Sequence, residues 1–159
     1  CFLPHGNYQK LVVEEMKTKP KSGNIVTEDG EILGKHTGLF NYTIGQRKGL
    51  GIAYKHPLYV IGFNGERNEV IVGSNERLFT NRMICKFYNF LDDTIHKELK
   101  AEGKIRYAAN PSPCTARILD DDTMEVIFDE PQRAITPGQS VAFYNGTQLL
   151  GGAVIDRVC

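Results

Sequence analysis

Residues 115–128 read TARILDDDTMEVIF, two short apolar-rich runs on either side of three aspartates. Short runs of this kind, bounded by turn residues, are typical of β-strands. The pattern recurs in the second half of the chain, and Pro137-Gly138 and Asn145-Gly146 supply further turns. We expect six strands there, at residues 84–90, 104–108, 115–119, 124–128, 140–144 and 149–155. Six short strands at this spacing predict a small closed β-barrel, because closure removes exposed sheet edges.

The first half of the chain predicts a helix followed by a smaller β module. Asn7 can cap a helix over residues 8–17. A hairpin at 24–27 and 31–33 would turn at Asp29-Gly30, and two further strands are expected at 58–63 and 69–72. We therefore predict a mainly β protein in three parts: residues 1–20 with a short N-terminal helix, residues 21–81 as a small central β domain, and residues 82–159 as the barrel.

Composition excludes several classes of protein. The chain has 19 basic and 19 acidic residues among 159, so it is not a globally cationic nucleic-acid binder, although a local basic patch is still possible. No apolar run approaches the roughly 20 residues of a membrane helix. The four cysteines have neither C-x-x-C spacing nor histidines at zinc-ligand spacing, so we expect reduced thiols and no metal site.

The densest set of candidate binding residues is HTGLFNYTIGQRKGLG, residues 36–51. Arg47 and Lys48 are flanked by glycines, which allow a phosphate backbone to approach closely and leave backbone N–H groups free. Tyr42 and Gln46 can stack on or hydrogen-bond an unpaired base. A glycine-rich turn on a solvated surface explains the same residues equally well. The stretch has no G-x-x-x-x-G-K-[ST] phosphate loop.

Four other residues are candidates from their chemistry. Arg106 and Tyr107 adjoin on a predicted strand, where a cation beside an aromatic suits nucleic acid, but a buried Tyr107 beside a solvated Arg106 fits the pattern better. Gln139, in the turn TPGQ at 136–139, can both donate and accept hydrogen bonds. Cys1 can act as a nucleophile or carry sulfur only as a thiolate, and the residues beside it favour an incidental thiol.

Several stretches occur in an order that resembles one known family. Besides YTIGQRKGLG at 42–51, they are CFLP at 1–4, GKHTG at 34–38, PLYV at 57–60, VG at 72–73, RY at 106–107, TPGQ at 136–139 and LGG at 150–152. Together they resemble the bacterial tRNA-specific 2-thiouridylases, whose older label is tRNA methyltransferase. The resemblance runs essentially end to end, and its most specific part is the run at 42–51.

The resemblance implies that this chain is the rear portion of a sulfur-transfer enzyme. The family has an N-terminal ATP-pyrophosphatase domain, a central β domain and a C-terminal barrel like those of translation factors. Only the last two match here, with the tail of the first, and the chain begins at Cys1 without a methionine. We therefore expect a cytoplasmic enzyme that uses ATP as a full-length protein, and a fragment that binds no cofactor and is inactive alone.

The resemblance also assigns roles to individual residues. In the family, the C2 oxygen of the wobble uridine is adenylated in tRNAs for Lys, Glu and Gln, and a persulfide sulfur from a cysteine desulfurase or sulfur-relay protein replaces it. Cys1 matches the cysteine that carries the persulfide, whose partner cysteine, absent here, closes a disulfide or assists sulfur release. Arg106, Tyr107 and Gln139 match positions that touch tRNA.

The physical argument adds Arg47 and Lys48 to the tRNA-contacting residues, and we expect both to share one tRNA-facing side with Arg106. Two alternatives stay open. One is a non-enzymatic RNA-binding or translation-associated β-barrel module in which Cys1 is incidental. The other is a methyltransferase, which only the older family label suggests, because the chain has no glycine motif for S-adenosylmethionine.

Overall fold

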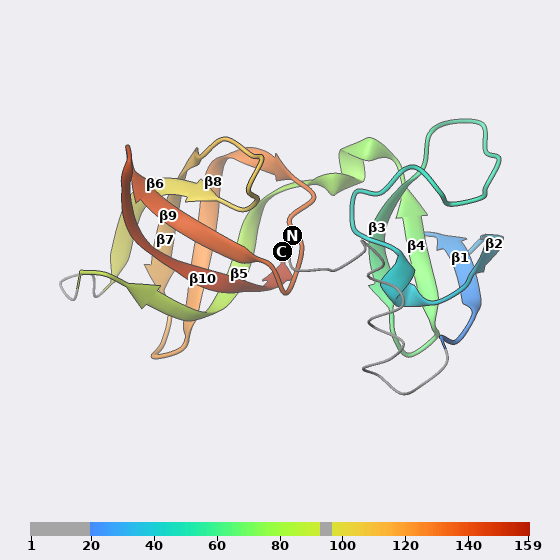
Figure 1. Cartoon of the computed structure of the whole chain (residues 1–159), viewed down its shortest axis with the longest axis horizontal. Coiled ribbons are helices and arrows are strands. Elements are labelled where there is room, and N and C mark those ends of the chain that lie inside the picture. Colours follow the sequence, from blue (N-terminus) through green and yellow to red (C-terminus); the bar gives the residue numbers. More distant parts are fainter. Residues whose placement is uncertain (1–19, 93–96) are drawn as a thin grey trace, which may run out of the picture. The chain divides into compact units, whose positions relative to one another are not determined.

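Strands dominate both halves of the chain, as the sequence predicted. The computed structural model describes residues 20–92 and 97–159. They form a four-stranded sheet and a closed barrel, in two units divided between Arg77 and Leu78 (Figure 1). The helix expected over residues 8–17 and the candidate Cys1 lie outside the described residues.

The first unit is a mixed sheet in the order β2-β1-β4-β3. Its strands are β1 (Gly23–Thr27), β2 (Ile32–His36), β3 (Tyr59–Asn64) and β4 (Glu69–Gly73). Strand β1 pairs antiparallel with β2 and parallel with β4. The β1–β2 turn closes where the Thr27 amide donates to the Glu31 carbonyl at 2.9 Å, with Gly30 at φ 85°. The predicted hairpin and both later strands are confirmed to within a few residues.

A long connection joins β2 to β3 and contributes to the core. It contains one 3-10 turn, η2 (Leu39–Asn41), and it buries Leu50 and Leu58 beside the strand residues. The core of the unit consists of Ile25, Leu50, Leu58, Val60, Val70 and Val72. Because Leu50 and Leu58 are held in this core, the intervening segment is fixed at both ends while most of its side chains face outward.

The second unit is a closed barrel, which confirms the six-stranded prediction. After a 3-10 turn, η3 (Asn75–Leu78), its strands are β5 (Phe79–Phe90), β6 (Glu98–Lys104), β7 (Ser112–Ile118), β8 (Thr123–Arg133), β9 (Ser140–Asn145) and β10 (Gln148–Val158). They close in the order β10-β5-β8-β7-β6-β9, and each neighbouring pair is antiparallel. The largest side chains buried inside it are Phe128, Phe143, Met83, Met124 and Ile155.

One predicted strand, at residues 104–108, was wrong. Strand β6 ends at Lys104, and Arg106 and Tyr107 lie in the loop that follows. The strand itself reads ELKAEGK, residues of low β-propensity, but pairing along its length with β7 and with β9 at its end overrides propensity. Gly103 permits the close packing inside, since a Cβ there would lie 2.8 Å from the Phe128 ring.

Candidate nucleic-acid interface

The barrel brings Arg106, Tyr107 and Gln139 together around one open hollow of about 620 Å³. The end of β6 and the loop after it form one side, and the turn before β9 and the outer face of β9 form the other. The residues that line the hollow are Lys104, Ile105, Arg106, Tyr107, Gly138, Gln139, Ser140, Ala142 and Tyr144. We call this surface the barrel groove.

Arg106 ties the two sides of the barrel groove together. Its Nη2 donates to the carbonyl oxygen of Ala134 at 2.6 Å, and it lies 3.4 Å from Oγ1 of Thr136. Ala134 is buried and has a positive φ of 56°, so the segment before the turn is bent where the guanidinium holds it. The side chain is therefore part of the structure, while its partial exposure leaves its other nitrogens near the surface.

The turn that carries Gln139 is fixed by the backbone of β10. The Gly138 amide donates to the carbonyl of Ile155 at 2.8 Å, and the Ile155 amide donates to the carbonyl of Gln139 at 2.8 Å. Gly138 has a φ of 83°, which a residue with a Cβ adopts only with strain. These bonds hold the backbone and leave the exposed Gln139 side chain able to meet a ligand.

Tyr107 is 98% exposed, although its ring is a large apolar surface. The sequence pattern had favoured a buried Tyr107 and a solvated Arg106, and the structure reverses this. The ammonium of Lys104 lies 5.7 Å from the centroid of the Tyr107 ring, within the range of a cation–π contact. A ring presented to solvent beside a cation is the arrangement that stacks on a base next to its phosphate.

Sequence reasoning missed Lys104 and Tyr144 in the barrel groove. Val141 and Phe143 point into the barrel, so Ser140, Ala142 and Tyr144 face outward, and Lys104 pairs with Ala142 in register. The alternation in SVAFY could have indicated the outward side of β9, but only the β6–β9 pairing shows what lies next to it. The groove lining contains two cations and no carboxylate.

The glycine-rich run at 42–51 is held in shape by its own polar groups. The Gln46 side chain accepts from the Thr43 amide at 3.0 Å and donates to the Lys48 carbonyl at 2.9 Å. The amide of Gly45 donates to the Val60 carbonyl at 2.8 Å, and the Val60 amide donates to the Gln46 carbonyl at 2.9 Å. Gln46 thus fixes the loop, and its predicted role as a free base-reading group is not favoured by this geometry.

His36 anchors the start of the same connection. It is 1% exposed, its Nδ1 accepts from the Gly38 amide at 3.0 Å, and its Nε2 lies 3.0 Å from the Asn68 carbonyl, to which a protonated Nε2 donates. One neutral tautomer therefore satisfies both ring nitrogens. Tyr42 packs its ring edge-on to His36 with centroids 5.9 Å apart, so it too serves the core of this unit.

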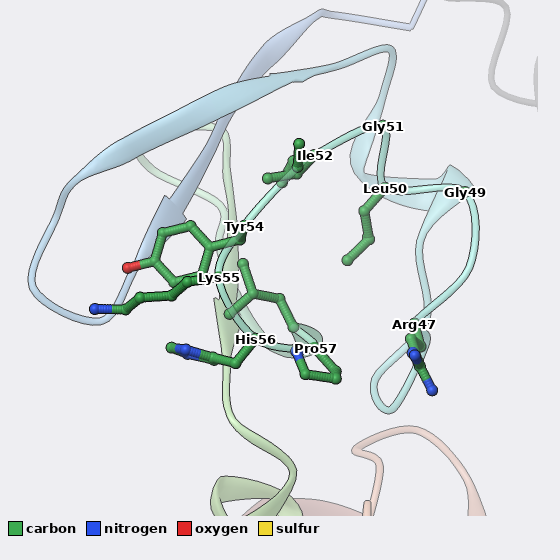
Figure 2. Close-up of a pocket in the computed structure, with 11 residues that line it drawn as sticks. Arg47, Gly49, Leu50, Gly51, Ile52, Tyr54, Lys55, His56 and Pro57 are labelled. Atoms are coloured by element: carbon green, nitrogen blue, oxygen red, sulfur yellow. The ribbon is translucent and has the colours of Figure 1, made fainter.

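Arg47 and Lys48 are both exposed. Arg47 stands at the edge of a second hollow, of about 730 Å³, which lies entirely in the first unit (Figure 2). The other residues around it are Gly49, Leu50, Gly51, Ile52, Ala53, Tyr54, Lys55, His56, Pro57 and Leu58. We call it the loop hollow. Whether Arg47 and Lys48 share one face with Arg106 stays a prediction, since they belong to different units.

The described cysteines differ in exposure, since two are buried and one lies at the surface. Burial raises the pKa of both the Cys85 and Cys114 thiols to about 12, whereas Cys159 is exposed. Within residues 20–92 and 97–159, no group of three or more His, Cys, Asp or Glu side chains is placed to hold a metal ion. No helix in that part of the chain is long and apolar enough to cross a membrane.

Comparison with known proteins covers both units. Residues 10–74 match the model described as a tRNA methyl transferase PRC-barrel domain, and residues 80–155 match the aminomethyltransferase beta-barrel domain. The tRNA-specific 2-thiouridylase MnmA of Clostridioides difficile is 44% identical over 158 residues, which are 99% of this chain and 44% of that protein. MnmA 1 of Clostridium tetani is 45% identical over 159 residues, again 99% of this chain and 44% of the relative.

A third relative, MnmA of Carboxydothermus hydrogenoformans, is 44% identical over 158 residues, 99% of this chain and 43% of that protein. The chain thus spans less than half the length of the curated relatives it matches. The matched stretch spans both the small sheet and the barrel.

Proposed function

Since the chain belongs to the family of the tRNA-specific 2-thiouridylases, we propose that it is the tRNA-binding portion of an ATP-dependent sulfurtransferase that 2-thiolates the wobble uridine of tRNA. The observation that carries the proposal is the barrel groove. Gln139 is far from Arg106 and Tyr107 in the sequence, yet all three line one hollow. No carboxylate lines that hollow.

The chemistry of the barrel groove suits RNA. A chain with no net charge must concentrate cations locally to hold a polyanion, and Lys104 and Arg106 do so here. The exposed Tyr107 ring offers a stacking surface, and the Gln139 amide offers both a donor and an acceptor to a base or ribose. Arg47 and Lys48, which are exposed on the first unit, would add phosphate contacts.

The proposed sulfur transfer begins at Cys1. A cysteine desulfurase or sulfur-relay protein would place a persulfide there, and its terminal sulfur would attack C2 of the uridine as adenylate leaves. A partner cysteine from the rest of the full-length enzyme would then attack the Cys1 sulfur. The S–S bond would break towards the uridine, leaving the thiocarbonyl on tRNA and a disulfide at Cys1. We propose tRNAs for Lys, Glu and Gln as the substrates, and the cytoplasm as the compartment.

We place ATP binding in the part of the enzyme that this chain does not span. ATP supplies the adenylate that turns the C2 oxygen into a leaving group. The helices of the described residues are two short 3-10 turns, and neither follows a glycine-rich phosphate loop. The described residues therefore offer no phosphate loop for ATP, and we propose that their part is to hold and orient the tRNA.

Titration of the 159-residue chain with one of the proposed tRNAs tests the binding role. Tyr107→Ala and Gln139→Ala should each weaken binding about five- to tenfold with little change in its salt dependence, since neither side chain is charged. Tyr88→Phe is a matched control, because Tyr88 lies on β5 outside the groove. Unchanged affinity in both groove variants would contradict the proposal.

A further inference from the structure

We propose that the loop hollow in the first unit binds one unpaired nucleotide of the RNA, with its base against Tyr54 and its phosphate near Arg47. This inference rests on the proposed RNA-binding function and adds a site to it. The hollow is built from the segment between Arg47 and Leu58 and includes no residue of the barrel. The glycine-rich run gives the loop hollow its shape, and the side chains that line the hollow select the class of ligand.

The floor of the loop hollow and the limb that carries Arg47 are both held in place by contacts within the first unit. Leu50 and Leu58, each 8% exposed, belong to the core of the unit and form an apolar floor. Gln46 and the Gly45–Val60 backbone bonds fix the limb that carries Arg47. Gly49 and Gly51 have φ values of 80° and 67°, and nothing lies within 4 Å of a Cβ built at Gly51. The backbone is therefore bent and open to close approach from outside.

The rim of the hollow combines an aromatic pair with cations. Tyr54 and His56 meet edge to face with ring centroids 4.9 Å apart, and the Lys55 ammonium lies 5.8 Å from the Tyr54 centroid. Figure 2 shows Tyr54, Lys55 and His56 on one limb and Arg47 on the facing limb, with Leu50 between them. The lining includes two permanent cations and no carboxylate.

This combination selects a class of ligand. An apolar floor with an exposed ring suits a planar group, and cations without a carboxylate suit an anion. A nucleotide combines a planar base with an anionic phosphate, and one sugar separates the two. In an unpaired nucleotide the face of the base is open to stack on an aromatic ring. The volume of about 730 Å³ is within the range of pockets for small ligands and leaves room for one nucleotide.

The test uses the 159-residue chain with a fluorescent seven-nucleotide single-stranded RNA and, separately, with tRNA. Tyr54→Ala should weaken binding to the single strand about five- to tenfold, whereas Tyr54→Phe, which keeps the ring, should stay within about twofold of the wild type. Arg47→Ala should reduce the log–log salt slope by about 0.7, the value for one phosphate of a single strand. Lys35→Ala is the control, since Lys35 is an exposed cation on β2 outside the hollow.

Ultraviolet cross-linking of the same RNA followed by peptide mapping locates the contact directly, and we expect the cross-link within residues 52–58. Uridine monophosphate alone should compete only at millimolar concentration if the site serves RNA, and tight binding of the free nucleotide would overturn the RNA assignment. Thermal melting shows that each variant is folded. Tyr54→Ala affinity within twofold of wild type, with cross-links only outside residues 47–58, would sink this inference.

The outcomes separate this inference from the proposed function. If Tyr107→Ala weakens tRNA binding but Tyr54→Ala does not, the barrel groove stands and the loop hollow is wrong. If Tyr54→Ala, Tyr107→Ala and Gln139→Ala all leave tRNA binding unchanged, both are wrong. If the chain binds no RNA at all, both are equally overturned.

Discussion

Replacing Arg106 by alanine should reduce both the stability of the barrel and its affinity for tRNA. The change removes the 2.6 Å bond from Nη2 to the Ala134 carbonyl, in a segment where Ala134 is buried. A hydrogen bond to a charged group contributes about 1.5–3 kcal/mol. The Thr136 hydroxyl still donates to the same carbonyl at 3.0 Å, so we take the lower end, about 1.5 kcal/mol.

For a barrel of this size, a loss of about 1.5 kcal/mol lowers the midpoint of thermal unfolding by roughly 6–12 °C. Circular dichroism melting measures this shift. Arg157→Ala is a matched control, because Arg157 pairs only with its neighbour Asp156 at 3.2 Å among the described residues and has a 64% exposed side chain. That variant should melt within about 2 °C of the wild type.

Binding measurements separate the structural role of Arg106, its bond to the Ala134 carbonyl, from a contact with phosphate. We call this bond the Arg106 brace. If Arg106 also meets a phosphate, Arg106→Ala should flatten the log–log salt slope of tRNA binding by about one, and Arg106→Lys should restore the slope but not the melting temperature. A variant that melts and binds as the wild type does would refute both roles. A normal melting temperature with weaker binding would refute the brace alone.

Three further predictions follow from described contacts and from the proposed chemistry. In the full-length enzyme, Cys1→Ser should abolish thiolation and leave tRNA affinity nearly intact by gel shift; substantial residual thiouridine would mean that another residue carries the sulfur. At pH 8, peptide mapping after iodoacetamide treatment should show Cys159 modified, and Cys85 and Cys114 protected until the protein is denatured. Burial holds the pKa of both buried thiols near 12, whereas the same thiols ionise at about 8.5 in the unfolded chain. The free energy of unfolding should therefore keep its full contribution from these thiols below about pH 8.5 and fall as the pH rises towards 12. Gly103→Ala, whose new Cβ would lie 2.8 Å from Phe128 and 3.0 Å from the Cys114 sulfur, should destabilise the barrel by about 1–3 kcal/mol in a denaturant titration, whereas Gly65→Ala, with open space around it, should not.

Much of the barrel could be predicted because its strands have apolar alternation and clear turns. The hairpin of β7 and β8 is the plainest case, since Asp120 accepts from the amides of Asp122 and Thr123 and so closes the turn through its own side chain. Strand β6 could not be predicted in the same way. It contains Glu, Lys, Ala and Gly, and its strand conformation depends on partners that closure of the barrel places on both sides.

The sequence identified three residues of the barrel groove, but it did not predict their positions in the fold. Arg106, Tyr107 and Gln139 were all identified from the sequence, yet Arg106 and Tyr107 were assigned to a strand. In the loop their environments are reversed, with Tyr107 almost wholly exposed and Arg106 bonded to the Ala134 carbonyl. Lys104 and Tyr144 were missed because only the pairing of β6 with β9 sets them beside the others.

The glycine-rich run shows why the most specific motif in a sequence need not be the part that touches the ligand. Its polar side chains are occupied within the loop: Gln46 bonds to Thr43 and Lys48, and Tyr42 packs on the buried His36. These contacts hold the loop in one backbone shape. This shape presents Arg47 and, on the opposite limb, Tyr54, which are the side chains that we propose contact RNA. The same division holds in the barrel groove, where backbone bonds to Ile155 and the Arg106 brace fix the loops while Tyr107 and Gln139 stay exposed. In both units we therefore expect substitutions of the fixing residues to change stability first, and substitutions of the presented residues to change RNA affinity alone.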